Sequence, residues 1–178
     1  MNEELTIQQD RMRFEKNTKS SRLAILAIIL NVFYFISIYS VNKSAYYTYW
    51  MGISIVYNLV FMLAAFLCSE GAKNYNAKYS KLLVLLGIGQ FIRIFILPAM
   101  MHGMLVSESE PVLEDTLHIL GYNIPVTVDN VVMGSGQYFR VILYLALSGV
   151  CLIWSAVVNS RKSKALEAHI ANLSLHQA

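Results

Sequence analysis

The amino-acid sequence predicts an all-α integral membrane protein. We expect four transmembrane helices in an antiparallel up-and-down bundle, with a long outer loop between helices 3 and 4. The first observation is composition: 56% of the 178 residues are hydrophobic and 14% are charged, whereas a soluble domain is about 45–50% apolar and about 25% charged. The second is that the apolar residues form four runs of about twenty, which is the length that crosses a bilayer. The third is that the charges cluster between these runs.

The four apolar runs divide the chain into a polar tail, a membrane domain and a second polar tail. The N-terminal tail is mixed in charge and too poor in apolar residues to predict a firm amphipathic helix. Tyrosines and a tryptophan after the first run favour a membrane interface, where amphipathic rings concentrate. The N-terminal tail is predicted at residues 1–22, the membrane domain at 23–158 and the C-terminal tail at 159–178; within the domain, the spans are 23–41, 50–69, 82–101 and 138–158, and the outer loop is 102–137.

The outer loop and the C-terminal tail each contain one helical signal. In the loop, a proline suited to a first helical turn and leucines at helical spacing predict a short helix over residues 111–120. The β-branched run that follows is compatible with an extended segment or a small hairpin around Asp129 and Asn130. In the tail, Leu166, Ile170 and Leu173 recur at helical spacing and predict a short amphipathic helix.

The distribution of lysine and arginine predicts the orientation. Five of them lie in the N-terminal tail, three in the loop between the second and third spans, and three in the C-terminal tail. The two connections on the other side hold only Lys43 and Arg140, the latter at a span edge. Because basic residues concentrate on the cytoplasmic side, we expect a multi-pass protein of the plasma (inner) membrane with both termini cytoplasmic. Basic residues in these positions serve topology, so the net charge of +3 does not indicate a nucleic-acid partner.

Polar residues near the middle of three spans predict a buried polar layer. Asn31, Asn58, Gln90 and Arg93 all lie within about two residues of the middle of their span, on the order of 3 Å along the helix. Tyr34 and Tyr57 lie slightly outward of this level. In a bundle of spans that cross the bilayer in alternating directions, the middles of all spans lie at the same depth. We therefore expect these side chains to meet inside one bundle, as a binding site or a buried polar layer.

Arg93 admits two interpretations. Amides and hydroxyls often hydrogen-bond across membrane helices, and the layer then serves only as structural glue. An arginine keeps its charge, however, and none of the predicted spans contains a carboxylate that would neutralise it. The counter-charge would then come from outside the chain, as an anionic ligand, a lipid headgroup or an acid on another subunit. Pro98, one turn outward, predicts either a tolerated kink or a hinge beside the site.

Motifs for catalysis and metal binding are missing from the sequence. It has no HExxH, GxSxG or phosphate-binding loop, and Cys68 and Cys151 lie in predicted spans without metal-ligand spacing. Glu114, Asp115 and His118 would share a helix face, which is usually a solvated one. We therefore expect no cofactor and no metal.

Three classes of function remain open. The first is a non-catalytic subunit or accessory protein of a larger membrane complex, which the small size and the unpaired Arg93 favour. The second is a channel or carrier formed as a homo-oligomer, with the polar layer around Arg93 lining an anion-selective route for transport. The third and weakest is a membrane-embedded enzyme. The expected partners are the lipid bilayer, other membrane subunits or further copies of the chain, and an anionic ligand or lipid at Arg93.

Overall fold

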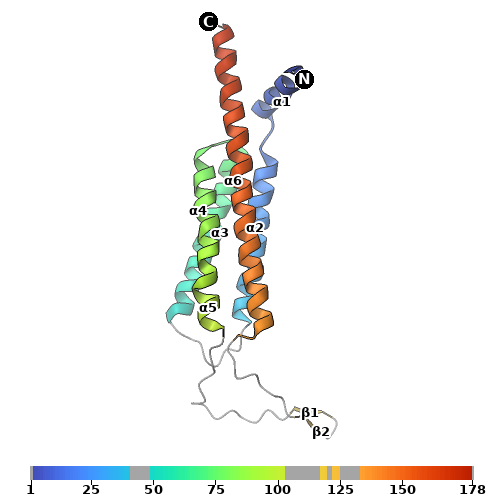
Figure 1. Cartoon of the computed structure of the whole chain (residues 1–178), viewed down its shortest axis with the longest axis vertical. Coiled ribbons are helices and arrows are strands. Elements are labelled where there is room, and N and C mark those ends of the chain that lie inside the picture. The colour runs from blue at the N-terminus through green and yellow to red at the C-terminus, as the bar shows by residue number, and fades with distance from the viewer. Residues whose placement is uncertain (1, 41–48, 103–116, 120–121, 125–132, 178) are drawn as a thin grey trace.

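The computed structural model describes residues 2–40, 49–102, 117–119, 122–124 and 133–177. Four long helices dominate these residues, and the shorter elements lie at their ends (Figure 1). The elements in chain order are α1 (Asn2–Phe14), α2 (Thr18–Tyr39), α3 (Tyr49–Lys73), α4 (Lys78–Phe95), α5 (Leu97–Met101), β1 (Leu117–Ile119), β2 (Tyr122–Ile124) and α6 (Ser135–Gln177).

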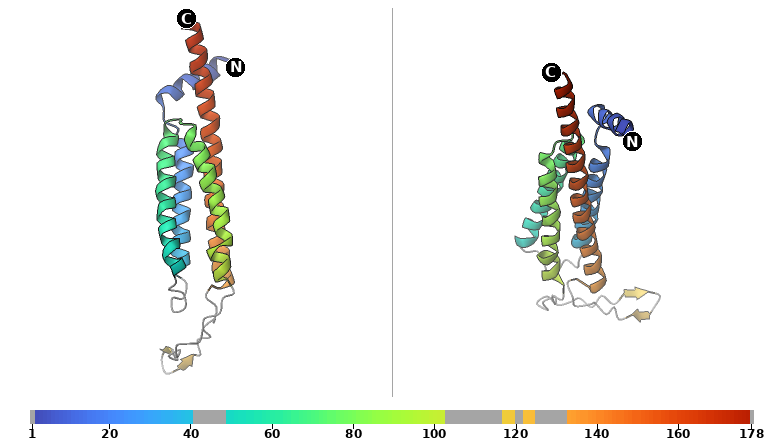
Figure 2. Two further views of the ribbon diagram at one scale, coloured as in Figure 1. Left: turned by 90° about the vertical axis from the view of Figure 1, so that its left-hand side faces the viewer. Right: turned by 45° about the horizontal axis from the view of Figure 1, so that its top comes forward.

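Four helical segments are long and apolar enough to cross a membrane: Thr18–Tyr39, Gly52–Lys73, Lys78–Ala99 and Ser135–Leu173. The views in Figures 1 and 2 show α2, α3, α4 and α6 side by side. One end of this group, here called the terminal end, carries α1 and the last turns of α6. The opposite end, here called the loop end, carries α5 and the two short strands. A chain of this composition therefore folds into helices that satisfy their own backbone groups, as a bilayer requires.

Small polar side chains join α2 to α6 near the terminal end. Ser20 Oγ donates to the carbonyl oxygen of Ser155 at 2.9 Å, and Ser155 Oγ donates to that of Ser20 at 2.8 Å. Ser21 shares a 2.8 Å hydrogen bond with Ser69 on α3. Each hydroxyl thus finds an acceptor on a neighbouring helix, which lets polar residues lie in the interior at little cost.

Glycine permits a close approach of α4 and α6. A Cβ atom built on Gly87 would lie 2.7 Å from Ile153 Cγ1 and 3.1 Å from the carbonyl oxygen of Gly149. A Cβ on Gly149 would lie 3.1 Å from the carbonyl oxygen of Gly87. The two backbones therefore touch at this point, which a larger residue on either helix would prevent.

Two apolar clusters fill the interior, one toward each end. The cluster at the terminal end is built mostly from alanine and leucine, and the cluster at the loop end from larger side chains. The first comprises Ala24, Ala27, Phe61, Ala65, Cys68, Ala72, Leu83, Leu152 and Ala156, and the second comprises Tyr34, Ile38, Leu97, Met101, Met133, Val141 and Leu145. Buried polar residues of the predicted layer lie between them.

The helices differ from the predicted spans mainly at the terminal end. α2 begins at Thr18 instead of residue 23, because Ser20 and Ser21 are buried against neighbouring helices. α6 continues past the predicted end of the fourth span to Gln177, so most of the expected tail is part of the same helix. Residues of the N-terminal tail form α1, which contacts α6 through a 2.7 Å hydrogen bond between Asp10 Oδ1 and His169 Nε2.

The predicted helix over residues 111–120 is wrong where the structure describes it. Residues Leu117–Ile119 form strand β1, which pairs antiparallel with β2 in the register Leu117 with Ile124. Ile119 in β1 and Tyr122 and Ile124 in β2 are β-branched or aromatic residues, which favour an extended ladder over a short helix. Residues 103–116, and the alternative hairpin around Asp129 and Asn130, lie outside the described residues.

The two ends of the outer loop meet at the loop end of the bundle. His102 forms a parallel β-bridge with Met133, and its ring stacks on that of Tyr138 with 4.1 Å between the centroids. The start of the loop is therefore fixed beside the start of α6.

Candidate functional site

Arg93 on α4 is the centre of the buried polar layer. Its side chain is 6% exposed and donates three hydrogen bonds to amide oxygens. Arg93 Nη1 donates to Asn31 Oδ1 at 3.0 Å and to Gln90 Oε1 at 3.1 Å, and Nη2 donates to Asn58 Oδ1 at 2.9 Å. One amide comes from α2, one from α3 and one from α4 itself, so the guanidinium ties three helices together.

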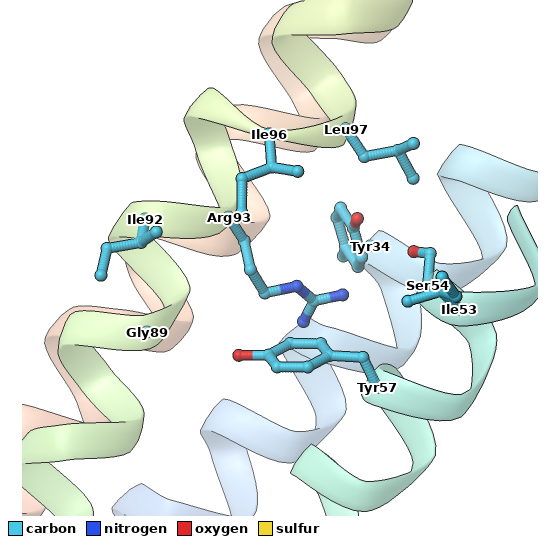
Figure 3. A pocket seen from close by; sticks show the side chains of 9 residues that line it. All are labelled: Tyr34, Ile53, Ser54, Tyr57, Gly89, Ile92, Arg93, Ile96 and Leu97. Carbon is cyan, nitrogen blue, oxygen red and sulfur yellow. The ribbon is translucent and has the colours of Figure 1, made fainter. Parts of the chain in front are cut away.

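Aromatic rings surround the guanidinium on its remaining sides. The guanidinium carbon of Arg93 lies 4.5 Å from the ring centroid of Tyr34, 4.9 Å from that of Tyr57 and 5.9 Å from that of Phe61. Figure 3 shows the guanidinium between the rings of Tyr34 and Tyr57. Cations are attracted to ring faces within about 6 Å, so the rings stabilise the charge without neutralising it.

The partners of Arg93 are electrically neutral. Among the described residues, no Asp or Glu oxygen lies within salt-bridge distance of its guanidinium; the ion pairs involve Asp10, Glu15 and Glu70 near the terminal end. Removing an arginine from water costs several kcal/mol, or about 2.5–3.5 kcal/mol on insertion scales. Amides and rings offset part of this cost, but the full positive charge remains.

The guanidinium of Arg93 can only donate hydrogen bonds, so every group bonded to it must accept. Each amide therefore turns its oxygen toward Arg93 and its nitrogen away. Asn31 Nδ2 donates to Asn58 Oδ1 at 2.8 Å, and Gln90 Nε2 donates to Asn31 Oδ1 at 3.2 Å and Ser148 Oγ at 3.3 Å. Asn58 Nδ2 is left over: it is buried and has no hydrogen-bond partner among the described residues. Among the described residues, the layer therefore contains a buried nitrogen without an acceptor and a positive charge without a counter-charge.

A cavity of about 370 Å³ lies beside Arg93, between α3 and α4. Its walls are mainly aliphatic and aromatic, and Arg93 and Ser54 supply polar groups (Figure 3). The lining residues are Tyr34, Ile53, Ser54, Tyr57, Gly89, Ile92, Arg93, Ile96 and Leu97. Small-molecule sites have this composition, with apolar walls and few polar groups in a volume of about 300–1,000 Å³.

α4 is interrupted at the edge of this cavity. The helix ends at Phe95, Ile96 adopts φ −90° and ψ −94°, and α5 begins at Leu97 with Pro98 in its first turn. Pro98 has no N–H group to bond the carbonyl four residues earlier. The sequence predicted a kink or a hinge here; the structure shows a broken helix, and movement about the break remains a prediction.

No protein family, curated protein or solved structure matches this chain. In the described ranges, no group of three or more His, Cys, Asp or Glu side chains lies together in a way that would hold a metal ion. His118 belongs to a strand there, whereas Glu114 and Asp115 lie outside the described residues.

The structure brings together all six residues that the sequence placed in the layer: Asn31, Tyr34, Asn58, Tyr57, Gln90 and Arg93. Measured on the observed helices, the layer lies toward the loop end. Arg93 is four to five residues past the middle of Lys78–Ala99, or about 7 Å. Sequence reasoning missed Phe61 and Gly89, whose role depends on how α3 and α4 are rotated about their axes.

Proposed function

We propose that this chain is a non-catalytic subunit or accessory protein of a membrane complex, and that Arg93 binds an anionic group supplied from outside the chain. In this proposal the four long helices cross the bilayer as an antiparallel bundle with both termini cytoplasmic. One observation carries it: Arg93 is buried among described partners that are all neutral. A permanent charge in such a place is usually paired, and an external anion would pair it.

The other function classes receive less support from the same geometry. Apolar clusters lie on both sides of the polar layer, and buried hydroxyls toward the terminal end, such as those of Ser20 and Ser155, already bond to neighbouring helices, which favours close packing over an open route. The layer consists of a guanidinium, amides, phenols and a serine hydroxyl. This set suits binding better than bond making, because it lacks a group that accepts a proton readily near neutral pH.

The test compares the wild type with Arg93→Gln and Arg93→Lys. Glutamine keeps a hydrogen-bond donor and loses the charge. Lysine keeps the charge, but its ammonium group lacks the planar array of N–H groups with which the guanidinium of Arg93 reaches three oxygens. Each protein is purified from native membranes in mild detergent, and native mass spectrometry records what stays bound. We expect an additional bound mass on the wild type, none on Arg93→Gln and a partial amount on Arg93→Lys.

Thermal unfolding in the same detergent separates binding from folding. Removing an uncompensated buried charge should leave the melting temperature of Arg93→Gln unchanged or higher. Identical bound species on all three proteins would show that Arg93 is structural and that the proposal is wrong.

A further inference from the structure

The cavity between α3 and α4 faces the side of the bundle. Its rim contains Ile53, Ile92 and Ile96, whose side chains are 40%, 55% and 51% exposed. In a membrane-spanning helix, such outward apolar side chains face the lipid tails. A molecule dissolved in the bilayer would therefore reach Arg93 sideways, without passing through water.

The walls of the cavity fit apolar groups of an occupant, and its inner end at Arg93 fits a polar group. Isoleucine and leucine side chains line most of the walls, and the ring of Tyr57 closes the side toward the terminal end (Figure 3). Gly89 leaves the α4 wall without a side chain at the level of the Tyr57 hydroxyl. An occupant that fits has an apolar body and one polar end that meets Arg93.

The polar end must supply one negative charge and acceptor oxygens for the guanidinium. Arg93 lines the cavity and has no counter-charge among the described residues, whereas Asn58, which also bonds to it, does not line the cavity. A carboxylate brings one charge and two oxygens with about four lone-pair sites, and it accepts from a guanidinium in a two-pronged geometry. An alcohol or a ketone would leave the charge unpaired, while a phosphate monoester carries about −1.5 to −2 at neutral pH against one arginine.

Depth also favours a single-chain ligand over a membrane phospholipid. Arg93 lies about 7 Å from the middle of its span, hence about 8 Å inside a hydrocarbon core of about 30 Å. Phospholipid headgroups lie at the edge of that core and are far larger than a carboxylate, whereas Arg93 borders a cavity of only about 370 Å³. We propose that the cavity binds a single-chain carboxylate amphiphile, with its headgroup on Arg93 and its chain passing between Ile53 and Ile92 into the bilayer. This inference rests on the proposed function, because it identifies the external anion.

The direct test is binding of hexadecanoate to the full-length protein in phosphatidylcholine nanodiscs. Radiolabelled hexadecanoate is displaced by unlabelled hexadecanoate, by hexadecanol or by hexadecyl phosphate, which share one chain length and differ in headgroup. We expect hexadecanol to bind about 10–100-fold more weakly, because it loses charge-assisted hydrogen bonds. Equal affinity for hexadecanol would overturn the carboxylate assignment, and so would tighter binding of hexadecyl phosphate.

Two glycine substitutions test the position of the site without removing Arg93. A Cβ on Gly89 would lie 3.4 Å from the Tyr57 hydroxyl, so Gly89→Leu should fold and fill the cavity. Gly52→Leu is the matched control, because a Cβ there meets nothing within 4 Å and Gly52 does not line this cavity. We expect Gly89→Leu to lower hexadecanoate affinity by about tenfold or more, and Gly52→Leu to leave it unchanged. Equal affinities for both variants would overturn the site.

Arg93→Gln distinguishes the failure of this inference from the failure of the proposed function. Loss of hexadecanoate binding in this variant supports both. Undiminished binding refutes the carboxylate site. If, in addition, the mass lost from Arg93→Gln in native mass spectrometry is a polypeptide, the proposed function stands and only the ligand class is wrong. If no mass is lost, both are wrong.

Discussion

Asn58→Asp should supply the missing counter-charge inside the chain. Asn58 Oδ1 already accepts from Arg93 Nη2 at 2.9 Å and from Asn31 Nδ2 at 2.8 Å. Aspartate has nearly the same shape, so its carboxylate can keep both bonds. It also replaces the buried Nδ2 of Asn58, which has no partner among the described residues, with a second acceptor oxygen.

The expected gain follows from three terms. Opposite charges about 4 Å apart attract by about 4 kcal/mol at an effective dielectric constant near 20. Burying the new carboxylate costs several kcal/mol, which offsets most of this attraction. The new oxygen takes the place of a buried nitrogen that has no partner among the described residues, so exchanging one unsatisfied group for another contributes little. We therefore expect the free energy of unfolding to rise by about 1 kcal/mol, and the melting temperature by about 2–4 °C for a chain of this length.

The assay is thermal unfolding in detergent at neutral pH, with Asn58→Leu as the control. Leucine has similar volume but leaves Arg93 Nη2 and Asn31 Nδ2 without their acceptor, so it should lower stability by about 1–3 kcal/mol for each donor. The aspartate variant should also lose the ligand, because Arg93 is then paired internally. A melting temperature for Asn58→Asp as low as that of Asn58→Leu would refute the reasoning, because the charge of Arg93 would then need no counter-charge.

Three further predictions address packing, pH dependence and topology. Gly87→Ala should lower the free energy of unfolding by about 1–3 kcal/mol, because its Cβ would press on Ile153 and on the α6 backbone; Gly52→Ala, with open space, should be neutral or stabilising by up to about 1 kcal/mol. Burial and the nearby Lys19 lower the pKa of Lys162. Between the pKa of Lys162 in the folded state and its higher pKa in the unfolded state, the folded protein binds fewer protons than the unfolded protein, so stability should rise as the pH increases across this interval. Lys162→Met should raise the melting temperature at neutral pH and flatten that rise, and an unchanged pH profile would contradict it. A cysteine placed at Glu114 should be labelled from outside intact cells and one at Lys78 or Lys164 should not; outside labelling at Lys78 would reverse the orientation.

The four long helices could be predicted from the sequence, because a run of about twenty apolar residues is stable mainly as a helix that crosses a membrane. Their ends could not, since polarity marks where a membrane crossing stops and not where a helix stops. Ser20 and Ser21 look like part of a polar tail, yet each is buried with a hydrogen-bond partner on another helix. The charges of Arg161 and Lys162 end the apolar run, but both residues are good helix formers and α6 continues through them.

The residues of the polar layer were also predictable, because depth along a helix follows directly from residue number. The direction in which each side chain points was not. That direction depends on the rotation of each helix, which here is set by contacts such as Gly87 against Gly149. The sequence therefore predicted which residues meet. It did not predict that Asn58 Nδ2 would find no partner among the described residues, or that a cavity would lie between α3 and α4.

The tight contact at Gly149 divides α6 into unequal arms. Fourteen residues separate Gly149 from Ser135 at the loop end, and twenty-eight separate it from Gln177 at the terminal end. At about 1.5 Å per residue, these arms are about 21 Å and about 42 Å long. The longer arm is held to the start of α2 by the hydrogen bonds between Ser20 and Ser155 and from Asn17 to Asn159. A tilt of α6 about Gly149 would therefore have to break these bonds or carry α2 with it.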